Sequence, residues 1–433
     1  MKICVLGLDC ATPESVFDDE RLVNLRRLMD LGVYGRMQSV FPPGTPCEWD
    51  CFSASQDPGS LGMHGVRSRM DRTYKPPVGY RDSTPARTIA SVVNQAGGKA
   101  TILGGRELSG AFDDDAGEDS LKKILAQSGE RWSAFQSQVS GTDWSYLFFS
   151  DPTLRLIRNS PSYRTDQDGP EIYSFADHYR MLDEQIGAIL ELIDNETVLL
   201  VLSTHGVQPL QGTFFVNEWL IRQGLLVLQE SPSQMTPVHD LEIDWSKTQA
   251  WAEGGPCGQI FLNVQKRELQ GIIPATEYES YRENLRTQID HHKNDYDAPG
   301  LQALKPEEVC NRVNGIAPDL IVSVGKLDWN MSGSVGVGAL WQKSHVAMGD
   351  WTPSQHGLFV LAAPNCPLCG GYEGARLLDM APTLLDLAGY EIPETMQGRS
   401  LLAGEEKKSK SDNSSGSDDQ QLIRERLAGL GYI

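Results

Sequence analysis

The chain has 433 residues, of which 40% are hydrophobic and 22% are charged, the balance of a folded globular protein. Its net charge of −20 disfavours nucleic acid and anionic membranes as partners, because both carry negative charge. No apolar run approaches the roughly 18 residues of a membrane helix. The chain enters a strand at once, so we expect no signal peptide and a cytoplasmic protein, in which the eight cysteines are free thiols.

The first predicted strand is the apolar run at residues 3–6, and Asp9 follows its end. A carboxylate at the end of a parallel strand points into the crevice where α/β proteins bind ligands. A rigid turn then delivers Thr45, and Pro46 suits the first turn of a helix over residues 46–55. Thr45 is therefore either the N-cap of that helix or a nucleophile or metal ligand that faces Asp9.

Strand and helix signals alternate through much of the chain, which predicts an α/β fold. Further buried strands are predicted at residues 100–103, 146–149, 197–202, 319–324 and 358–363. Helices are predicted at residues 21–32, 88–95, 175–193 and 379–388.

The alternation of strand and helix signals stops after residue 207, where polar segments and hairpin-like pieces replace it. We interpret residues 208–316 as an inserted cap over the crevice, between a first part of the core at 1–207 and a second part at 317–402. The remaining segment, 403–433, is rich in Ser, Lys and Asp and is expected to be disordered, with a short C-terminal helix.

Polar side chains stand at four predicted strand boundaries. Asp9, Asp151 and the trio at residues 203–205, which includes His205, follow strands, and His356 precedes one. Such strand ends converge at one edge of an α/β sheet. Asp, His and Thr or Ser are ligands of hydrolytic metal sites, where a metal would activate a hydroxyl and offset phosphoryl charge. Each residue taken alone could instead be a cap or a core histidine.

Several short motifs occur together. They stand at residues 7–9 (Gly-Leu-Asp), 42–49 (Pro-Pro-Gly-Thr-Pro-Cys-Glu-Trp), 57–59 (Asp-Pro-Gly), 64–65 (His-Gly), 216–220, 244–248, 317–322 and 379–383. In this combination the chain resembles the alkaline phosphatase superfamily, and within it the type I phosphodiesterase / nucleotide pyrophosphatase group. The resemblance extends to about residue 402 and implies a three-layer sandwich: a large, mostly parallel sheet between helices, with an inserted cap.

Members of this group usually hold two metal ions and transfer a phosphoryl group through a Thr or Ser nucleophile. The resemblance implies that Thr45 is the nucleophile and also contacts metal, and that Asp9 is the first metal ligand. His205 matches the histidine of a Ser-Asp-His-Gly motif. Asp151 stands close to an expected aspartate ligand, and His356 falls in the segment that supplies the last histidine.

Two departures from the group reduce the expected metal sites. Thr204 replaces the aspartate before His205, and Arg155 stands where a histidine is expected. Each metal site has thus lost a ligand, so we predict one divalent ion rather than two, with zinc favoured over manganese or iron. Thr204 and Arg155 become predicted substrate-binding residues, because a guanidinium could replace lost metal charge and hold a phosphate or carboxylate. Arg155 could equally be a surface arginine.

The favoured hypothesis is a metal-assisted hydrolase or transferase that acts on a phosphoester or phosphodiester of a small anionic molecule through Thr45. One alternative is a degenerate family member that binds a ligand or a protein without turnover. Another is an enzyme recruited to a metal-poor reaction in the same crevice. The sequence identifies neither the substrate nor the oligomeric state.

Overall fold

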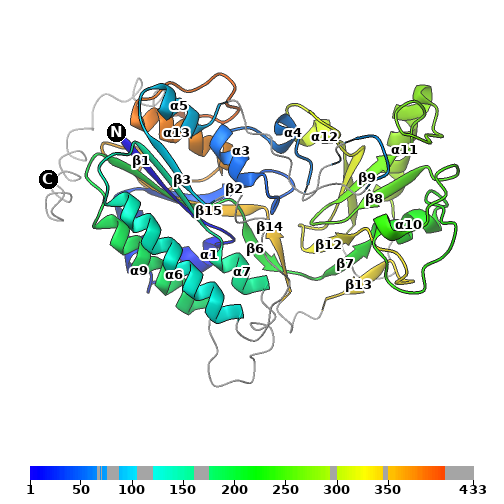
Figure 1. Ribbon diagram of the computed structural model, residues 1–433, viewed down its shortest axis with the longest axis horizontal. Helices are drawn as coiled ribbons and strands as arrows, with labels where there is room; N and C mark the ends of the chain where they lie inside the picture. Colours follow the sequence, from blue (N-terminus) through cyan, green and yellow to red (C-terminus); the bar gives the residue numbers. More distant parts are fainter. Residues whose placement is uncertain are drawn as a thin grey trace.

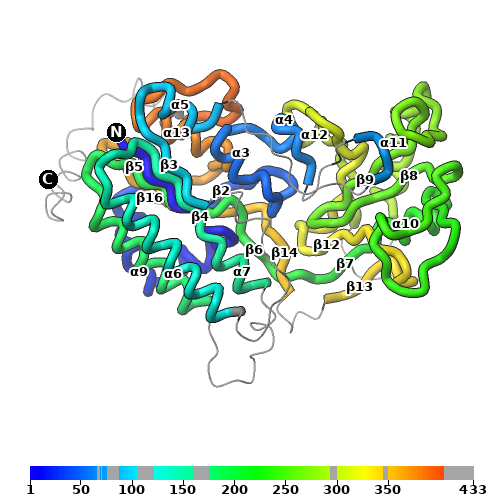
Figure 2. The backbone as a smooth tube through the Cα atoms, viewed as in Figure 1, coloured from blue at the N-terminus to red at the C-terminus, as the bar shows by residue number. Residues whose placement is uncertain are grey.

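The computed structural model describes residues 1–65, 69, 71–75, 87–104, 120–159, 175–292, 300–344 and 350–404. Two lobes lie side by side: a larger one built on a long sheet flanked by helices, and a smaller one built on shorter sheets (Figures 1 and 2). Of the tail predicted to be disordered, all but residues 403 and 404 lies outside the described ranges.

The larger lobe contains an eight-stranded sheet with the order β16-β2-β15-β5-β1-β4-β3, and β17 pairs beside β16 on β2. Neighbouring strands run parallel, except that β15 is antiparallel to both β2 and β5. This confirms the predicted α/β fold with a mostly parallel sheet. The strands are β1 (Lys2–Leu8), β2 (Val33–Gln38), β3 (Ala100–Leu103), β4 (Tyr146–Asp151), β5 (Thr197–Ser203), β15 (His356–Ala362), β16 (Gly370–Gly371) and β17 (Ala375–Arg376).

Helices cover both faces of this sheet because its central strands are apolar on both sides. Ile3 and Val5 of β1 belong to one buried cluster, and Cys4 and Leu6 belong to the other. The first cluster includes side chains from α3 (Glu48–Ala54), α5 (Ile89–Gln95) and α13 (Leu377–Ala388). The second includes side chains from α2 (Val23–Leu31), α6 (Ser120–Val139) and α9 (Phe175–Leu190). The large lobe is therefore a three-layer sandwich.

The smaller lobe is formed by chain that leaves the large sheet after β5 and returns at β15. One of its sheets has the order β10-β11-β9-β8 and is antiparallel, and a second has the order β12-β7-β13. Their strands are β7 (Gly212–Phe215), β8 (Ala250–Glu253), β9 (Gly258–Leu262), β10 (Leu301–Leu304), β11 (Leu320–Val324), β12 (Trp329–Ser332) and β13 (Trp341–Lys343). We call residues 212–343 the inserted lobe.

The strand predicted at residues 319–324 was assigned to the second part of the core, and that placement is wrong. It is β11, which pairs with β9 and β10 in the inserted lobe. All five residues of β11 are buried, so its apolar run gave no indication of which sheet it joins. The boundaries drawn at residues 208 and 403 stay predictions.

The remaining elements join the lobes or border the carboxyl edge of the large sheet. β6 (Gly206–Pro209) begins two residues beyond Thr204, the residue after β5, and pairs with β14 (Trp351–Ser354). The other helices are α1 (Pro13–Phe17), α4 (Pro58–Leu61), α7 (Thr153–Asn159), α10 (Val216–Arg222), α11 (Tyr278–Asp290) and α12 (Pro306–Val309). Among the helices of the described ranges, none has the length and apolar character to cross a membrane. All eight cysteines are free thiols, as predicted.

Candidate active site and metal centre

The candidate site lies at the carboxyl ends of β1, β4 and β5. Leu8 of β1 is opposite Asp151 of β4, and Gly7 is opposite Leu202 of β5. This register brings Asp9 next to the end of β4, where its N–H donates to the carbonyl of Asp151 at 3.0 Å. The three strand ends therefore meet at one edge, as the sequence pattern predicted.

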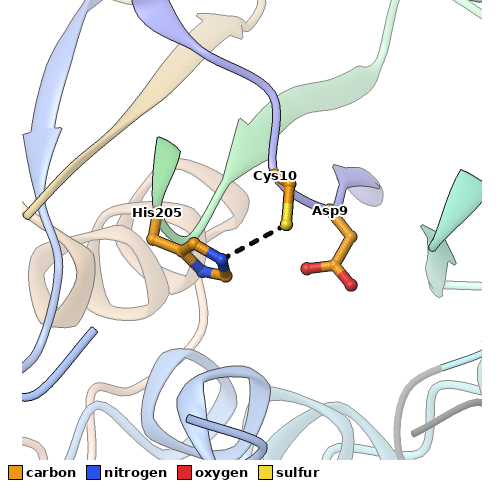
Figure 3. Close-up of side chains that lie close together, drawn as sticks. All are labelled: Asp9, Cys10 and His205. Atoms are coloured by element: carbon orange, nitrogen blue, oxygen red, sulfur yellow. Dashed lines mark hydrogen bonds between the residues drawn. The ribbon is translucent and has the colours of Figure 1, made fainter. Parts of the chain in front are cut away.

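Asp9, Cys10 and His205 form a buried cluster in which one potential ligand atom from each residue lies within 4.8 Å of the others. Figure 3 shows the Cys10 thiol between the other two side chains, with its Sγ 3.3 Å from Nε2 of His205. The backbone of Cys10 is left-handed, with φ of +68°, which a residue other than glycine adopts only when its surroundings enforce it. Such strain is concentrated at functional sites.

Glu48 stands at the centre of the hydrogen bonding around His205. It is only 2% exposed, and its Oε2 lies 2.6 Å from Nδ1 of His205. The hydroxyl of Thr204 also donates to Oε2 at 2.6 Å. The other oxygen, Oε1, accepts from the Ser39 hydroxyl at 3.0 Å and from the Gly44 N–H at 2.6 Å. Both carboxylate oxygens are thus satisfied, and the imidazole is held in one orientation.

This arrangement favours a charged pair in the metal-free protein. Burial alone raises the pKa of Glu48, but His205 and the Thr204 hydroxyl hold that pKa below its usual range. Burial alone lowers the pKa of His205, but Glu48 and the Cys10 thiol raise it well above its usual range. A metal ion bound to Nε2 of His205 would replace the proton on that nitrogen. Nδ1 would keep its proton and donate it in a hydrogen bond to Glu48.

Close packing allows α3 to bring Glu48 this far into the sheet edge. A Cβ atom at Gly7 would lie 2.4 Å from Cη2 of Trp49, the residue after Glu48. Any side chain at residue 7 would therefore displace the indole ring of Trp49 from its place against β1. Gly7 is required here by close approach rather than by its own φ angle.

Thr45 is 5% exposed, and its hydroxyl lies 3.2 Å from Sγ of Cys47 and 3.4 Å from the carbonyl oxygen of Pro42. The prediction that Thr45 is an N-cap is wrong, because α3 begins at Glu48 and Cys47 is its N-cap. Residues 45–47 form a turn instead, closed by the Glu48 N–H on the Thr45 carbonyl at 3.2 Å. The Thr45 hydroxyl is therefore not used for capping. Thr45 is three residues before Glu48, the residue whose carboxylate contacts His205.

Arg155, on α7, points to the site rather than to the general surface. Its Nε donates to Oδ2 of Asp9 at 2.7 Å, and the two side chains are largely buried. The guanidinium thus occupies one oxygen of the expected first metal ligand. It would compete with a metal for that oxygen, and it brings positive charge to the place where an anionic group would bind.

Asp151 lies at the same edge but is held by other partners. It is buried and accepts from Nε1 of Trp132 at 2.9 Å, from the Thr153 N–H at 3.1 Å and from the Thr153 hydroxyl. Burial raises the pKa of Asp151, against the effect of these donors. Its carboxylate ties the start of α7 to α6, and it is not in the three-residue cluster. Its role as a metal ligand stays a prediction.

His356 and Thr204 also lie outside that cluster. His356 is the exposed first residue of β15, opposite Gln38 of β2. Thr204 is fully buried and directs its hydroxyl to Glu48. Thr204, at the position where the resemblance implies a carboxylate, is therefore hydrogen-bonded to a carboxylate from α3. Substrate binding by Thr204 and metal binding by His356 stay predictions.

The donor set of the cluster fits one metal ion. Carboxylate oxygen, thiolate sulfur and imidazole nitrogen are the three ligand types that zinc takes in proteins, and three protein ligands leave a position for substrate. The thiol favours zinc over manganese. The Nδ1 contact of His205 with Glu48 is the supporting interaction that metal-bound histidines make.

Comparison with known proteins decides the family. The model of the type I phosphodiesterase / nucleotide pyrophosphatase family matches residues 3–103 and 112–350. The chain belongs to this family. No curated protein sequence matches the chain significantly.

Solved structures of the family share the fold of this phosphodiesterase-family chain. Human ectonucleotide pyrophosphatase / phosphodiesterase 5 matches with a TM-score of 0.57 and 12% identity, over 91% of this chain and 96% of the other. The murine protein, as an inactive variant in complex with AMP, matches with a TM-score of 0.55 and 11% identity, over 90% and 96%. Family and fold support the prediction of an enzyme that hydrolyses phosphoesters.

Two residues of this site were missed from the sequence. Glu48 falls inside the quoted motif around Thr45, but an acidic residue in a first helical turn usually faces water. Cys10 is adjacent to Asp9, and a thiol directly after a strand-end carboxylate was the available signal. Its direction depends on the left-handed backbone at residue 10, which the sequence did not indicate.

Proposed function

We propose that this protein hydrolyses a phosphoester or phosphodiester of a small anionic molecule through Thr45, with the help of one divalent metal ion. Family and fold support phosphoester chemistry. The observation that carries the proposal is the buried cluster of Asp9, Cys10 and His205, in which His205 contacts Glu48, the residue whose N–H closes the turn at Thr45. The AMP complex of the murine neighbour supports a phosphate-bearing molecule of about nucleotide size as the ligand.

Asp9, Cys10 and His205 would hold the metal ion. When bound, the ion would supply positive charge that polarises a phosphoryl oxygen. Zinc fits this donor set best, with manganese or iron as alternatives. A single ion agrees with the loss of the family's aspartate and histidine at residues 204 and 155.

Residues of the chain perform the other tasks. The Thr45 hydroxyl oxygen attacks phosphorus as the bond to the leaving oxygen breaks, and the hydroxyl proton passes to the leaving oxygen. Water then cleaves the bond between Thr45 oxygen and phosphorus, which regenerates the hydroxyl and releases phosphate from a monoester or a phosphomonoester from a diester. Arg155 binds phosphoryl oxygens with the guanidinium nitrogens that do not contact Asp9. Glu48 fixes the orientation of His205. Burial of Thr45 and Glu48 keeps the local dielectric low, which strengthens each of these interactions.

Metal analysis combined with two variants tests this function. We expect about one zinc per chain, hydrolysis of bis(p-nitrophenyl) phosphate, and loss of that activity in Thr45→Ala with the metal retained. Asp9→Asn should lose both metal and activity. Activity that is unchanged in Thr45→Ala would contradict Thr45 as the nucleophile, and a protein that binds no metal in excess zinc would contradict the metal centre.

A second candidate function is a metal-independent reaction with Cys10 as the nucleophile. The specific observation is the chain of contacts from Sγ of Cys10 to Nε2 of His205, at 3.3 Å, and from Nδ1 of His205 to Glu48, at 2.6 Å. A nucleophile, a base and a carboxylate that orients the base are the parts of a thiol-dependent hydrolase. Hydrolysis that survives chelation, and that is lost in Cys10→Ala but kept in Thr45→Ala, would favour this candidate over the first.

A further inference from the structure

Arg158 lies on α7 one turn after Arg155, and it is 7% exposed. The carbon at the centre of its guanidinium lies 4.1 Å from the ring centroid of Phe175 and 4.7 Å from that of Trp351. Two aromatic rings therefore hold a buried guanidinium in place. Trp351 is 37% exposed, so Arg158 lies one ring below the surface.

In the part of the chain that the structure describes, two nitrogen atoms of this guanidinium have no hydrogen-bond acceptor. Nε and Nη1 of Arg158 are buried and have no hydrogen-bond partner in the structure. Within the described ranges, Arg158 forms no ion pair either. A buried donor without an acceptor is costly and rare in folded proteins, so it calls for an explanation. Cation–π contacts with Phe175 and Trp351 offset part of the cost but leave the N–H groups unpaired.

Arg158 borders the candidate active site. Residues three apart on a helix lie on the same side, so Arg155 and Arg158 are neighbours on α7. Trp351 opens β14, which pairs with β6, and β6 begins at the residue after His205. Figure 1 shows α7 beside β6 and β14, between the large sheet and the inserted lobe.

We propose that Arg158 binds a second anionic group of the substrate, a phosphate or a carboxylate, separate from the phosphoester that is cleaved. The proposal rests on the proposed function for the first group, which Arg155 and the metal centre would bind. Arg155 has the Asp9 carboxylate as a partner, whereas Arg158 has no carboxylate partner among the described residues. On a chain with a net charge of −20, an uncompensated buried cation is the feature that would attract such a substrate.

Binding of two phosphonates that the enzyme cannot hydrolyse tests this directly. The probes are methylphosphonate, with one anionic group, and propylenebisphosphonate, with two, titrated calorimetrically into the full chain in EDTA. We expect the bisphosphonate to bind the wild type at least about tenfold more tightly, as a bidentate anion contact would provide. In Arg158→Met this preference should disappear while methylphosphonate binding is unchanged.

A matched control is Arg180→Met. Arg180 lies on α9, is exposed and pairs with Asp177, so its replacement should alter neither affinity. A wild type without any preference for the bisphosphonate would overturn the proposal, and so would an equal loss in both arginine variants.

Stability separates ligand binding from a purely structural role. Methionine keeps an apolar stem between the two rings and removes the unpaired donors, so Arg158→Met should unfold at the same or a higher temperature than the wild type. A lower Tm with the bisphosphonate preference retained would show that Arg158 is structural. If the Met variant does not fold, the same comparison with Arg158→Gln decides. Thr45→Ala should keep the affinities for both phosphonates. The binding test therefore remains valid even if Thr45 is not the nucleophile.

Discussion

Nδ1 of His205 lies 2.6 Å from Oε2 of Glu48, which joins the end of β5 to the first turn of α3. The contact is buried, and the same carboxylate also accepts from Thr204 and Gly44. A carboxylate on the far nitrogen of a metal-binding histidine fixes the ring and increases its basicity. Glu48 therefore connects the altered motif at residue 204 to the candidate metal centre.

Replacing Glu48 by glutamine should weaken metal binding by roughly 10–100-fold, because the amide is a poorer acceptor for the Nδ1 proton of His205. Competition with a chromophoric zinc chelator measures this affinity. Glu14→Gln is the control, because Glu14 is exposed, pairs with Arg36 and is not a member of the cluster. Equal zinc affinity in wild type and Glu48→Gln would show that the carboxylate does not support the centre.

Replacing Arg155 by methionine should move two affinities in opposite directions. Removal of the guanidinium frees Oδ2 of Asp9, so zinc should bind about tenfold more tightly. This factor corresponds to the free energy of one charge-assisted hydrogen bond. Methylphosphonate should bind several-fold more weakly, because its positive partner is gone. The same two titrations on Arg36→Met, an exposed arginine paired with Glu14, serve as control. Zinc affinity that falls in Arg155→Met would contradict competition for Asp9.

Asp151 is either a metal ligand or a residue that anchors the start of α7 to α6. Its contacts with Trp132 and Thr153 indicate an anchor, so Asp151→Ala should lower the free energy of unfolding by about 3 kcal/mol and leave the zinc content unchanged. Asp151→Asn keeps one acceptor oxygen and should lose about 1 kcal/mol. Denaturant unfolding and elemental analysis of both variants provide the comparison. Loss of zinc from a fully folded Asp151→Asn would establish the predicted ligand role instead.

His178, on α9, should make the fold sensitive to acid. Burial lowers the pKa of His178 to about 4, whereas the unfolded chain titrates near its usual value of about 6.5. Between these values the unfolded state binds a proton that the folded state does not, so stability falls as pH decreases through this window and levels off below about 4. At pH 5 the loss relative to pH 7.5 should be about 2 kcal/mol.

Urea unfolding of His178→Leu measures this contribution. Its stability should depend less on pH than that of the wild type between about pH 6.5 and 4. His291→Leu, at the exposed end of α11, is the control and should keep the wild-type slope. A slope that is the same in His178→Leu and the wild type would exclude His178 as the source.

The strand-end residues of the site were predictable from sequence because short apolar runs mark buried strands. Residues 3–6 and 197–202 were recognised as strands, and parallel strands in one sheet present their carboxyl ends at the same edge. Asp9 and His205 could therefore be paired although they are far apart in the chain. The same reasoning failed for β11, since a fully buried strand of five residues carries no periodicity that distinguishes the two sheets.

The sequence by itself determined the fold class, the family motifs and the two strand-end residues Asp9 and His205, because all of these depend on local pattern. Only the tertiary structure decided that Glu48 is buried against His205, since that requires α3 to pack closely over Gly7. It likewise decided the direction of Cys10, which depends on a left-handed backbone, and the contact of Arg155 with Asp9. These features are set by how separate elements pack, and no single stretch of the sequence contains that information.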